Sequence, residues 1–254
     1  MTDAKLAAEI ATRAGALLLE LRENYNGDLD ELRDAGDAQA QALIAQLLAE
    51  HRPGDLILSE EAVDDPKRLT ADRVWIVDPL DGTWEYGEGR WDWAVHIALW
   101  QREADDITDA AIFLPATNQL FTTDQPPVVP AWPTSAPKIV VSRTRPPKQL
   151  AQIQTAVTQL LKQQGLAESL ELLEVGSAGA KTAALLTGAA HLYVHDGGLN
   201  EWDAAAPFAI AKAAGIVVKH FDGQPLRYNQ PNVKLAAIYL ATAKMAEIFE
   251  QIEL

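Results

Sequence analysis

The N-terminal quarter of the chain repeats apolar positions at the spacing of a helix. Residues 3–22 place an apolar side chain every three or four positions, which predicts an amphipathic helix ending near Gly27. The apolar positions are Leu6, Ile10, Ala14, Leu17, Leu18 and Leu21. Residues 37–50 repeat the pattern, so a second helix is predicted there, closed by the sequence HRPG.

Short apolar runs with strand-forming residues follow the two helices. They predict strands in DLILSEE (55–61), DRVWIVDPLDGT (72–83), WAVHIALW (93–100) and DAAIFLPA (109–116). The runs are short and rich in residues that suit a buried sheet. The first half of the chain is therefore expected to pack two helices with one sheet.

A proline-rich segment divides the chain. Residues 126–137 read PPVVPAWPTSAP, and five prolines in so short a stretch are incompatible with a helix or a central strand. We interpret the segment as a linker or long surface loop between subdomains 1–125 and 138–254. Beyond it, strands and helices alternate. Strands are predicted at 138–142, 170–175 and 191–197, and helices at 148–164, 176–188 and 202–215. This alternation predicts an α/β fold.

Composition narrows the class of protein. The chain has 254 residues, 48% of them hydrophobic, which is enough for one large domain or two smaller ones. A net charge of −15 argues against nucleic acid and anionic membranes as partners. The absence of cysteine excludes disulfides, thiolate metal sites and cysteine nucleophiles. The start resembles no signal peptide and no stretch approaches a membrane span, so we expect a cytoplasmic protein.

The stretch VWIVDPLDGT, residues 74–83, carries the first candidate chemistry. Asp78 and Asp81 follow four apolar residues, Pro79 keeps Asp78 out of the helical region, and Gly82 permits a sharp turn. Thr83 follows at a position where the start of a helix or turn could present free backbone N–H groups to an anion. Two adjacent carboxylates repel unless a divalent cation binds between them. The alternative is an Asx-turn in which Asp81 caps a helix. Aspartyl-phosphate enzymes of the haloacid-dehalogenase type place Asp-x-Asp-x-Thr after a strand, and the spacing here is Asp-x-x-Asp-x-Thr, so Asp81 is one residue late for that role.

Other acidic residues join the candidate site. Glu60 and Glu61 end a predicted strand, Asp203 begins a helix in EWDAAAP, and Asp37 begins the second helix. Each has a simpler explanation, because Asp37 and Asp203 suit helix caps and the glutamate pair suits a solvated strand end.

Taken together and in order, the motifs SEE, DPLDGT and WDAAA resemble the lithium-sensitive, magnesium-dependent phosphatase superfamily. That superfamily includes inositol monophosphatases, fructose-1,6-bisphosphatases and 3′(2′),5′-bisphosphate nucleotidases. The resemblance runs from about residue 3 to Tyr239. It is greatest to CysQ-type nucleotidases, through SEEA, DPLDGTWEY, VSRTR, GSAGAK and EWDAAAP. Glu85 is typical of that type. Trp84 departs from it, since Arg or Lys is common there, and Tyr86 replaces Phe.

The resemblance implies a fold and an activity. The expected fold is a layered αβαβα sandwich of two subdomains. The expected reaction is hydrolysis of 3′-phosphoadenosine 5′-phosphate (PAP) to AMP and phosphate, with its sulfated analogue PAPS as a second substrate. Two alternatives stay open: the same chemistry on inositol 1-phosphate or fructose 1,6-bisphosphate, and a catalytically silent relative with a binding or regulatory role. The partner is then a small phosphorylated molecule, and the protein a monomer or homodimer.

The resemblance also assigns residues. Metal ligands would be Glu60, Asp78, the Leu80 carbonyl, Asp81 and Asp203, holding two or three Mg²⁺ ions. Catalytic residues would be Asp37, Glu60 and Thr83, with Asp37 hydrogen-bonded to Thr83 and the Thr83 hydroxyl orienting the attacking water. Substrate contacts would be Gly82, Thr83, Ser142, Arg145, Gly176, Ser177, Lys181 and Arg227.

Simpler explanations exist for several of these residues. The GSAGAK segment is also a plain strand-to-helix turn with a solvated lysine, and a surface loop explains Arg143 and Arg145. Four aromatic residues fall in strand-like runs: Trp75, Trp100, His96 and His191. We expect their side chains to pack in the core, and not to stack on a ligand or bind a metal.

Overall fold

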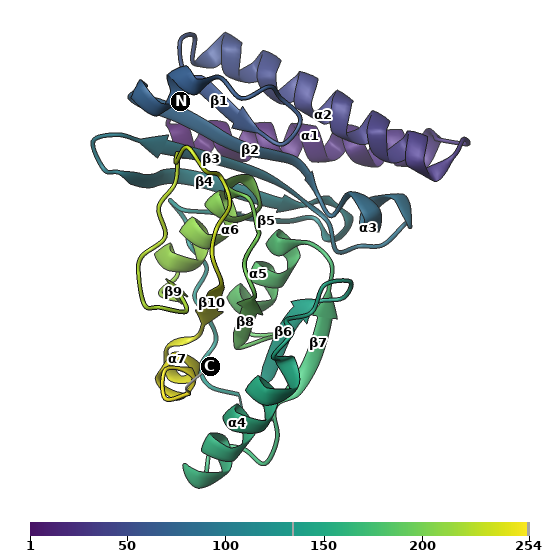
Figure 1. Cartoon of the computed structure of the whole chain (residues 1–254). Helices are drawn as coiled ribbons and strands as arrows, with labels where there is room; N and C mark the ends of the chain where they lie inside the picture. The colour runs from purple at the N-terminus through teal and green to yellow at the C-terminus, as the bar shows by residue number, and fades with distance from the viewer. Residues whose placement is uncertain (134, 253–254) are drawn as a thin grey trace.

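The computed structural model describes residues 1–133 and 135–252, arranged as five layers of helix and sheet (Figure 1). Two five-stranded sheets are separated by a pair of helices, and a further pair of helices covers the outer face of each sheet. This arrangement confirms the α/β fold class and the αβαβα layering expected from the sequence.

The first sheet has the strand order β1-β2-β3-β4-β5. β1 pairs with β2 in parallel and the other pairs are antiparallel. Its strands are β1 (Leu56–Ser59), β2 (Arg73–Asp81), β3 (Ala94–Gln101), β4 (Asp106–Leu114) and β5 (Gln119–Thr122). The helices before and between them are α1 (Asp3–Asn24), α2 (Leu29–His51), the short α3 (Thr83–Gly87) and two 3₁₀ turns, Pro66–Thr70 and Pro115–Thr117.

The second sheet has the order β7-β6-β8-β10-β9. β6 runs parallel to β7 and β8, and β10 is antiparallel to both of its neighbours. Its strands are β6 (Lys138–Ser142), β7 (Glu171–Val175), β8 (Leu192–His195), β9 (Val217–His220) and β10 (Ile238–Ala241). The helices of this half are α4 (Leu150–Gln163), α5 (Ala178–Leu186), α6 (Glu201–Ala213) and α7 (Ala243–Phe249).

Alternation along β2 shows how the layers form. Trp75 and Val77 pack against α1 and α2, whereas Val74 and Ile76 pack in the middle core with α5 and α6. A strand buried on both faces gives the continuous apolar run seen in the sequence. The middle core also takes residues of the second sheet, such as Tyr193. A third core lies between that sheet and helices α4 and α7.

The second helix starts earlier than predicted. It begins at Leu29, where the Asp28 side chain accepts a hydrogen bond from the Asp30 N–H at 2.8 Å. Asp37 therefore lies in the third turn of α2 and is not its cap. The prediction was wrong because the first two turns bury few apolar side chains, Leu32 being one, so apolar spacing does not reveal them.

The segment 126–137 joins β5 to β6. Its described residues form neither helix nor strand, as five prolines require, and Thr134 lies outside the described residues. Each sheet is built from one side of this segment, but the middle core contains side chains from both sides. The division into subdomains 1–125 and 138–254 stays a prediction.

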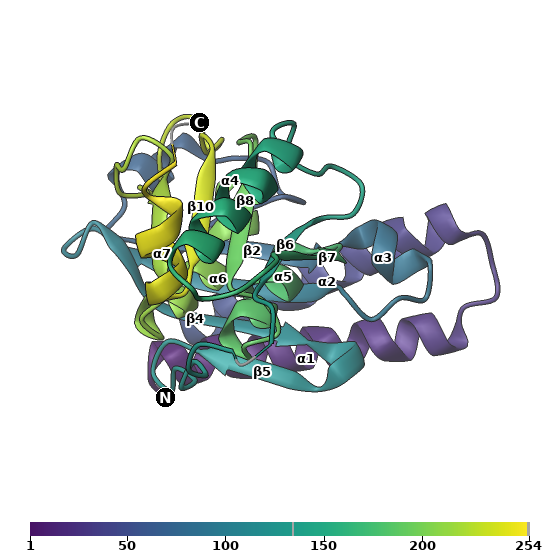
Figure 2. The ribbon, with the colours of Figure 1, turned by 90° about the horizontal axis from the view of Figure 1, so that it is seen from below.

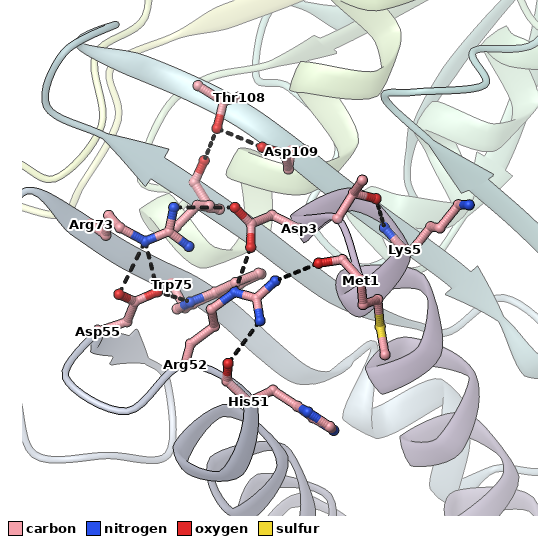
Figure 3. Close-up of polar contacts among 12 residues, drawn as sticks. Met1, Asp3, Lys5, His51, Arg52, Asp55, Arg73, Trp75, Thr108 and Asp109 are labelled. Carbon is pink, nitrogen blue, oxygen red and sulfur yellow. Dashed lines mark hydrogen bonds and ion pairs between the residues drawn. The ribbon is translucent and has the colours of Figure 1, made fainter.

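An ion-pair network fastens the outer helices to the first sheet (Figure 3). Asp3 at the start of α1 accepts from Arg52 at 2.7 Å and from Arg73 at 3.1 Å. Asp55 accepts from Arg73 at 3.0 Å and from the Trp75 indole at 2.8 Å. Burial would raise the pKa of Asp3, but the two guanidinium groups outweigh it and lower that pKa. The network joins the start of α1 and the end of α2 to β2.

None of the helices in the described part of the chain is long and apolar enough to span a membrane.

Candidate active site

The strand pairing brings the predicted carboxylates to one edge of the first sheet. β1 is parallel to β2, with Ser59 opposite Val77, so the next residue, Glu60, comes beside Asp78. On the other side Asp78 pairs with His96 and Asp81 pairs with Ala94, so three steps along β2 match two along β3. This bulge places Asp78 and Asp81 on the same face, where a regular strand would point them to opposite faces.

Asp203 reaches the same place from the second half of the chain. It lies in the first turn of α6, where its Oδ2 accepts a hydrogen bond from the Asn200 N–H at 2.6 Å. Carboxylate oxygens of Asp78, Asp81 and Asp203 all lie within 4.8 Å of one another. The three side chains and Glu60 line one cavity of about 250 Å³.

The cavity is lined by residues from both halves of the chain. They are Glu60, Asp78, Asp81, Gly82, Thr83, Trp84, Glu85, Ser142, Thr144, Arg145, Gly176, Ser177 and Asp203. Most of the predicted site residues are in this set. Trp84, Glu85 and Thr144 line it without having been predicted as site residues. The sequence could have indicated them by their neighbours. Trp84 and Glu85 follow DPLDGT directly, and Thr144 lies between two arginines.

The carboxylates are crowded, and their pKa values reflect it. Asp78 is 1% exposed; its Oδ1 accepts from the Leu80 N–H at 3.0 Å, and its Oδ2 has no hydrogen-bond partner among the described residues. Burial, followed by the charges of Asp81, Glu60 and Asp203, raises the pKa of Asp78 well above its ordinary value. The same two causes raise the pKa of Asp203 to about 6 and that of Glu60 to about 7. Without a cation these groups repel one another.

Asp81 differs because it has polar partners. Its Oδ2 accepts from the Gly179 N–H at 2.7 Å and lies 3.1 Å from His96 Nε2. Burial opposes ionisation, but His96 and Lys181 outweigh it and lower the pKa of Asp81. Gly179 cannot carry a side chain, because a Cβ there would stand 2.4 Å from His96 Nε2. His96 is fully buried, as expected of a core residue, and it contacts a site carboxylate as well.

Thr83 and Asp37 form the next part of the site. Gly82 has φ of +90°, which releases Thr83 from β2 to begin α3. The Thr83 hydroxyl donates to the Leu80 carbonyl at 3.0 Å. Burial raises the pKa of Asp37 to about 8, with Glu61 and Glu60 adding to it, while hydrogen bonding with Thr83 acts in the opposite direction. The third turn of α2, and not its start, therefore brings Asp37 to Thr83.

The substrate-contact predictions divide into two groups. Ser142, Arg145, Gly176 and Ser177 line the cavity together with Gly82 and Thr83. Lys181 is 3% exposed and its ammonium donates to the Gly176 carbonyl, so it stabilises the turn before α5. It is therefore not the solvated lysine that the simpler explanation expects. Arg227 is outside the cavity lining; its side chain is 70% exposed and lies 3.9 Å from Asp105.

Comparison with known proteins agrees with this geometry. A sequence model described as "Inositol monophosphatase family" matches residues 2–254. The chain belongs to the inositol monophosphatase family. It is 47% identical over 260 residues, covering 98% of this chain and 92% of that protein, to the "3'-phosphoadenosine 5'-phosphate phosphatase" of Mycobacterium leprae. It is 30% identical over 200 residues, covering 76% and 78%, to the "3'(2'),5'-bisphosphate nucleotidase CysQ" of Escherichia coli.

A solved structure also places the chain in the inositol monophosphatase family. The crystal structure of CysQ from Bacteroides thetaiotaomicron, described as a bacterial member of the inositol monophosphatase family, superimposes with a TM-score of 0.79 at 26% identity. The match covers 94% of this chain and 97% of that one.

The acidic cluster suits the metal dependence of the inositol monophosphatase family. One carboxylate oxygen from each of three side chains lies within 4.8 Å of the other two, and the unpartnered Asp78 Oδ2 is a buried acceptor that a cation would satisfy. All the candidate ligands are oxygens, which favours a hard divalent cation over zinc. The site is therefore an acidic cluster that could hold a metal ion, in a chain of a metal-dependent phosphatase family.

Proposed function

We propose that the chain is a Mg²⁺-dependent phosphomonoesterase that hydrolyses PAP to AMP and phosphate, with PAPS as a second substrate. The observation that carries the proposal is the buried carboxylate cluster with the unpartnered Asp78 Oδ2, facing a cavity that also contains Arg145. The name of the M. leprae relative supports the choice of substrate.

In this proposal the carboxylates of Glu60, Asp78, Asp81 and Asp203 hold two or three Mg²⁺ ions, with the Leu80 carbonyl as a further ligand. Bound Mg²⁺ supplies charge neutralisation at the phosphate and a lower pKa for the attacking water. Asp78 is central because it stands between Glu60, which follows β1, and Asp81 beyond the bulge.

Thr83 and Asp37 orient the attacking water. The Thr83 hydroxyl has one proton and two acceptors near it, the Leu80 carbonyl at 3.0 Å and the Asp37 carboxylate. When the Leu80 carbonyl serves as a ligand, the hydroxyl donates to Asp37 and presents its oxygen to the water. As the water attacks phosphorus, it passes a proton to the Thr83 oxygen while the Thr83 proton passes to the ionised Asp37 carboxylate. The ribose 3′ oxygen takes up a proton from solvent as its bond to phosphorus breaks.

The rest of the cavity binds the anion and the nucleoside. The Gly82 and Thr83 N–H groups lie at the start of α3 and contact the scissile phosphate. Arg145 is exposed, lines the cavity and has no ion-pair partner in the described part of the chain, so its charge is available for the second phosphate. Gly176 and Ser177 form the opposite wall.

The test is phosphate release from PAP, inositol 1-phosphate and fructose 1,6-bisphosphate, measured side by side at millimolar Mg²⁺, with and without lithium. We expect kcat/KM for PAP to exceed the others by tenfold or more, about 1.4 kcal/mol of transition-state discrimination. If the sugar phosphates match PAP, the substrate assignment fails and the metal chemistry remains. If none is hydrolysed, the chain is a silent relative.

A further inference from the structure

A cluster of charged side chains joins the two halves of the chain beside the active site. We call it the Arg143 clamp; it comprises the side chains of Arg143, Asp92 and Glu85 and the backbone of Gly176. Arg143 follows β6, and its guanidinium donates to Glu85 in α3 at 3.0 Å and to Asp92 at 2.6 Å. Figure 2 shows α3 beside β6 and β7. The contact crosses from the second sheet to the first.

Asp92 also binds the turn that precedes α5. It is fully buried, and its Oδ2 accepts the Gly176 N–H at 2.7 Å while its carbonyl accepts the Ser177 N–H at 3.1 Å. Burial would raise the pKa of Asp92, but hydrogen bonds from Arg143 and Gly176 lower it, which favours the ionised acceptor. One residue thus holds two consecutive amides of the cavity wall.

The turn is also fixed from its other sides. A Cβ on Gly176 would stand 2.2 Å from the Glu85 carboxyl, so the backbone lies directly on that side chain. Two residues after Ser177, the Gly179 N–H donates to the metal-site residue Asp81 at 2.7 Å. A continuous chain of contacts therefore runs from Arg143 through Asp92 and the turn to Asp81.

We propose that Arg143 and Asp92 are positioning residues of the active site, which fix the 176–179 turn from across the two halves and so set the affinity for the metal and the phosphate. Neither side chain is assigned to the reacting atoms. The inference rests on the proposed function for its ligands, but its structural consequence, the order of the turn, can be measured without substrate.

The experiment compares Arg143→Ala with Arg90→Ala. Arg90 is the matched control because it pairs with the same Asp92, through Oδ1 at 3.1 Å, but comes from the same loop as Asp92 and does not cross to the second half. Four quantities are measured well below the unfolding temperature: hydrogen exchange of residues 174–182, Mn²⁺ binding by calorimetry, and kcat and KM for PAP.

For Arg143→Ala we expect exchange of the turn amides to accelerate at least tenfold. Mn²⁺ affinity should weaken threefold or more and KM rise threefold or more, with kcat within about threefold of wild type. Arg90→Ala should leave all four quantities near wild type. Arg143→Lys should recover part of each effect. If Arg143→Ala does not fold, Asp92→Asn, which keeps the acceptor oxygen but weakens the pair, replaces it in the same measurements.

The inference is overturned if Arg143→Ala only lowers the unfolding temperature and leaves turn exchange and Mn²⁺ affinity unchanged. It is also overturned if Arg90→Ala has the same effects. A wild-type protein that does not hydrolyse PAP would contradict the proposed function instead, and the exchange and Mn²⁺ measurements would still decide the role of the clamp.

Discussion

Replacing Asp203 by Asn should stabilise the metal-free protein while abolishing its response to Mg²⁺. The reason is the burial of a charged Asp203 carboxylate beside Asp81, a cost that protonation or a bound cation relieves. Asn keeps an oxygen that accepts the Asn200 N–H, now held at 2.6 Å by the Asp203 carboxylate, so the start of α6 stays intact. The substitution thus removes one negative charge and little else.

The magnitude follows from the pKa of Asp203. Burial and then Asp81 raise that pKa from 3.8 to about 6. Because the folded-state pKa is raised, the folded protein binds the proton more tightly, and stability is lost as the pH rises from about 4 through about 6. At about 1.4 kcal/mol per pH unit, the ionised group costs about 2–3 kcal/mol at pH 8. For a chain of this size that is about 5–10 °C in unfolding temperature.

The assay is thermal and urea unfolding of both proteins in EDTA at pH 5 and pH 8, and again with saturating Mg²⁺. Wild type should lose stability from pH 5 to pH 8 in EDTA and regain it with Mg²⁺, by about 2.7 kcal/mol at a hundredfold excess over Kd. Asp203→Asn should be the more stable protein at pH 8 in EDTA and gain little from Mg²⁺.

Asp72→Asn is the matched control, because the Asp72 side chain is 89% exposed and its removal should change neither response. The reasoning is refuted if Asp203→Asn is less stable than wild type in EDTA at pH 8. It is equally refuted if Mg²⁺ stabilises both proteins by the same amount.

Three further substitutions test other parts of the structure. Asp78→Asn should lower kcat/KM by about 1,000-fold, roughly 4 kcal/mol, with an unchanged circular dichroism spectrum, and normal turnover would contradict its role as a ligand. Trp84 is 45% exposed in the cavity lining, so Trp84→Ala should lower kcat/KM about fivefold for PAP through lost base stacking and leave inositol 1-phosphate unchanged; equal losses would exclude a base contact. Asp55→Ala should destabilise the protein by about 2–3 kcal/mol in urea unfolding at constant kcat, since Arg73 and the Trp75 indole lose their acceptor (Figure 3); an unchanged midpoint would show that the network contributes little.

The layers were predictable because apolar spacing encodes them locally. Continuous apolar runs such as 74–77 belong to strands buried on both faces, and the sequence contains helices enough to cover those faces. Strands β5, β9 and β10 and helix α7 were not predicted. β9 is only half-buried and four residues long, so its pattern is too short to separate from a loop, and its pairing with β10 is a tertiary choice.

Most residues that line the cavity could be named from the sequence, whereas the hydrogen-bond partners of the basic residues could not. Asp37 was predicted as a site residue although its place in α2 was wrong, because a motif fixes identity and not helix boundaries. Lys181 and Arg143 show the converse. From the sequence alone, these two basic side chains suggest contact with solvent or substrate. In the structure Lys181 donates to the Gly176 carbonyl, and Arg143 donates to Asp92, which is 51 residues away in the sequence. Only the packing of the two halves supplies those partners.

The spacing within DPLD contains more information than its charges. Two carboxylates three apart on a regular strand point to opposite faces, so a shared metal requires one extra residue between them. Pro79 supplies the reason for it, because it has no N–H and cannot complete the ladder between β2 and β3. The register does shift between Asp78 and Asp81. A proline between two acidic residues in a buried strand therefore predicts both the bulge and the side on which the carboxylates meet.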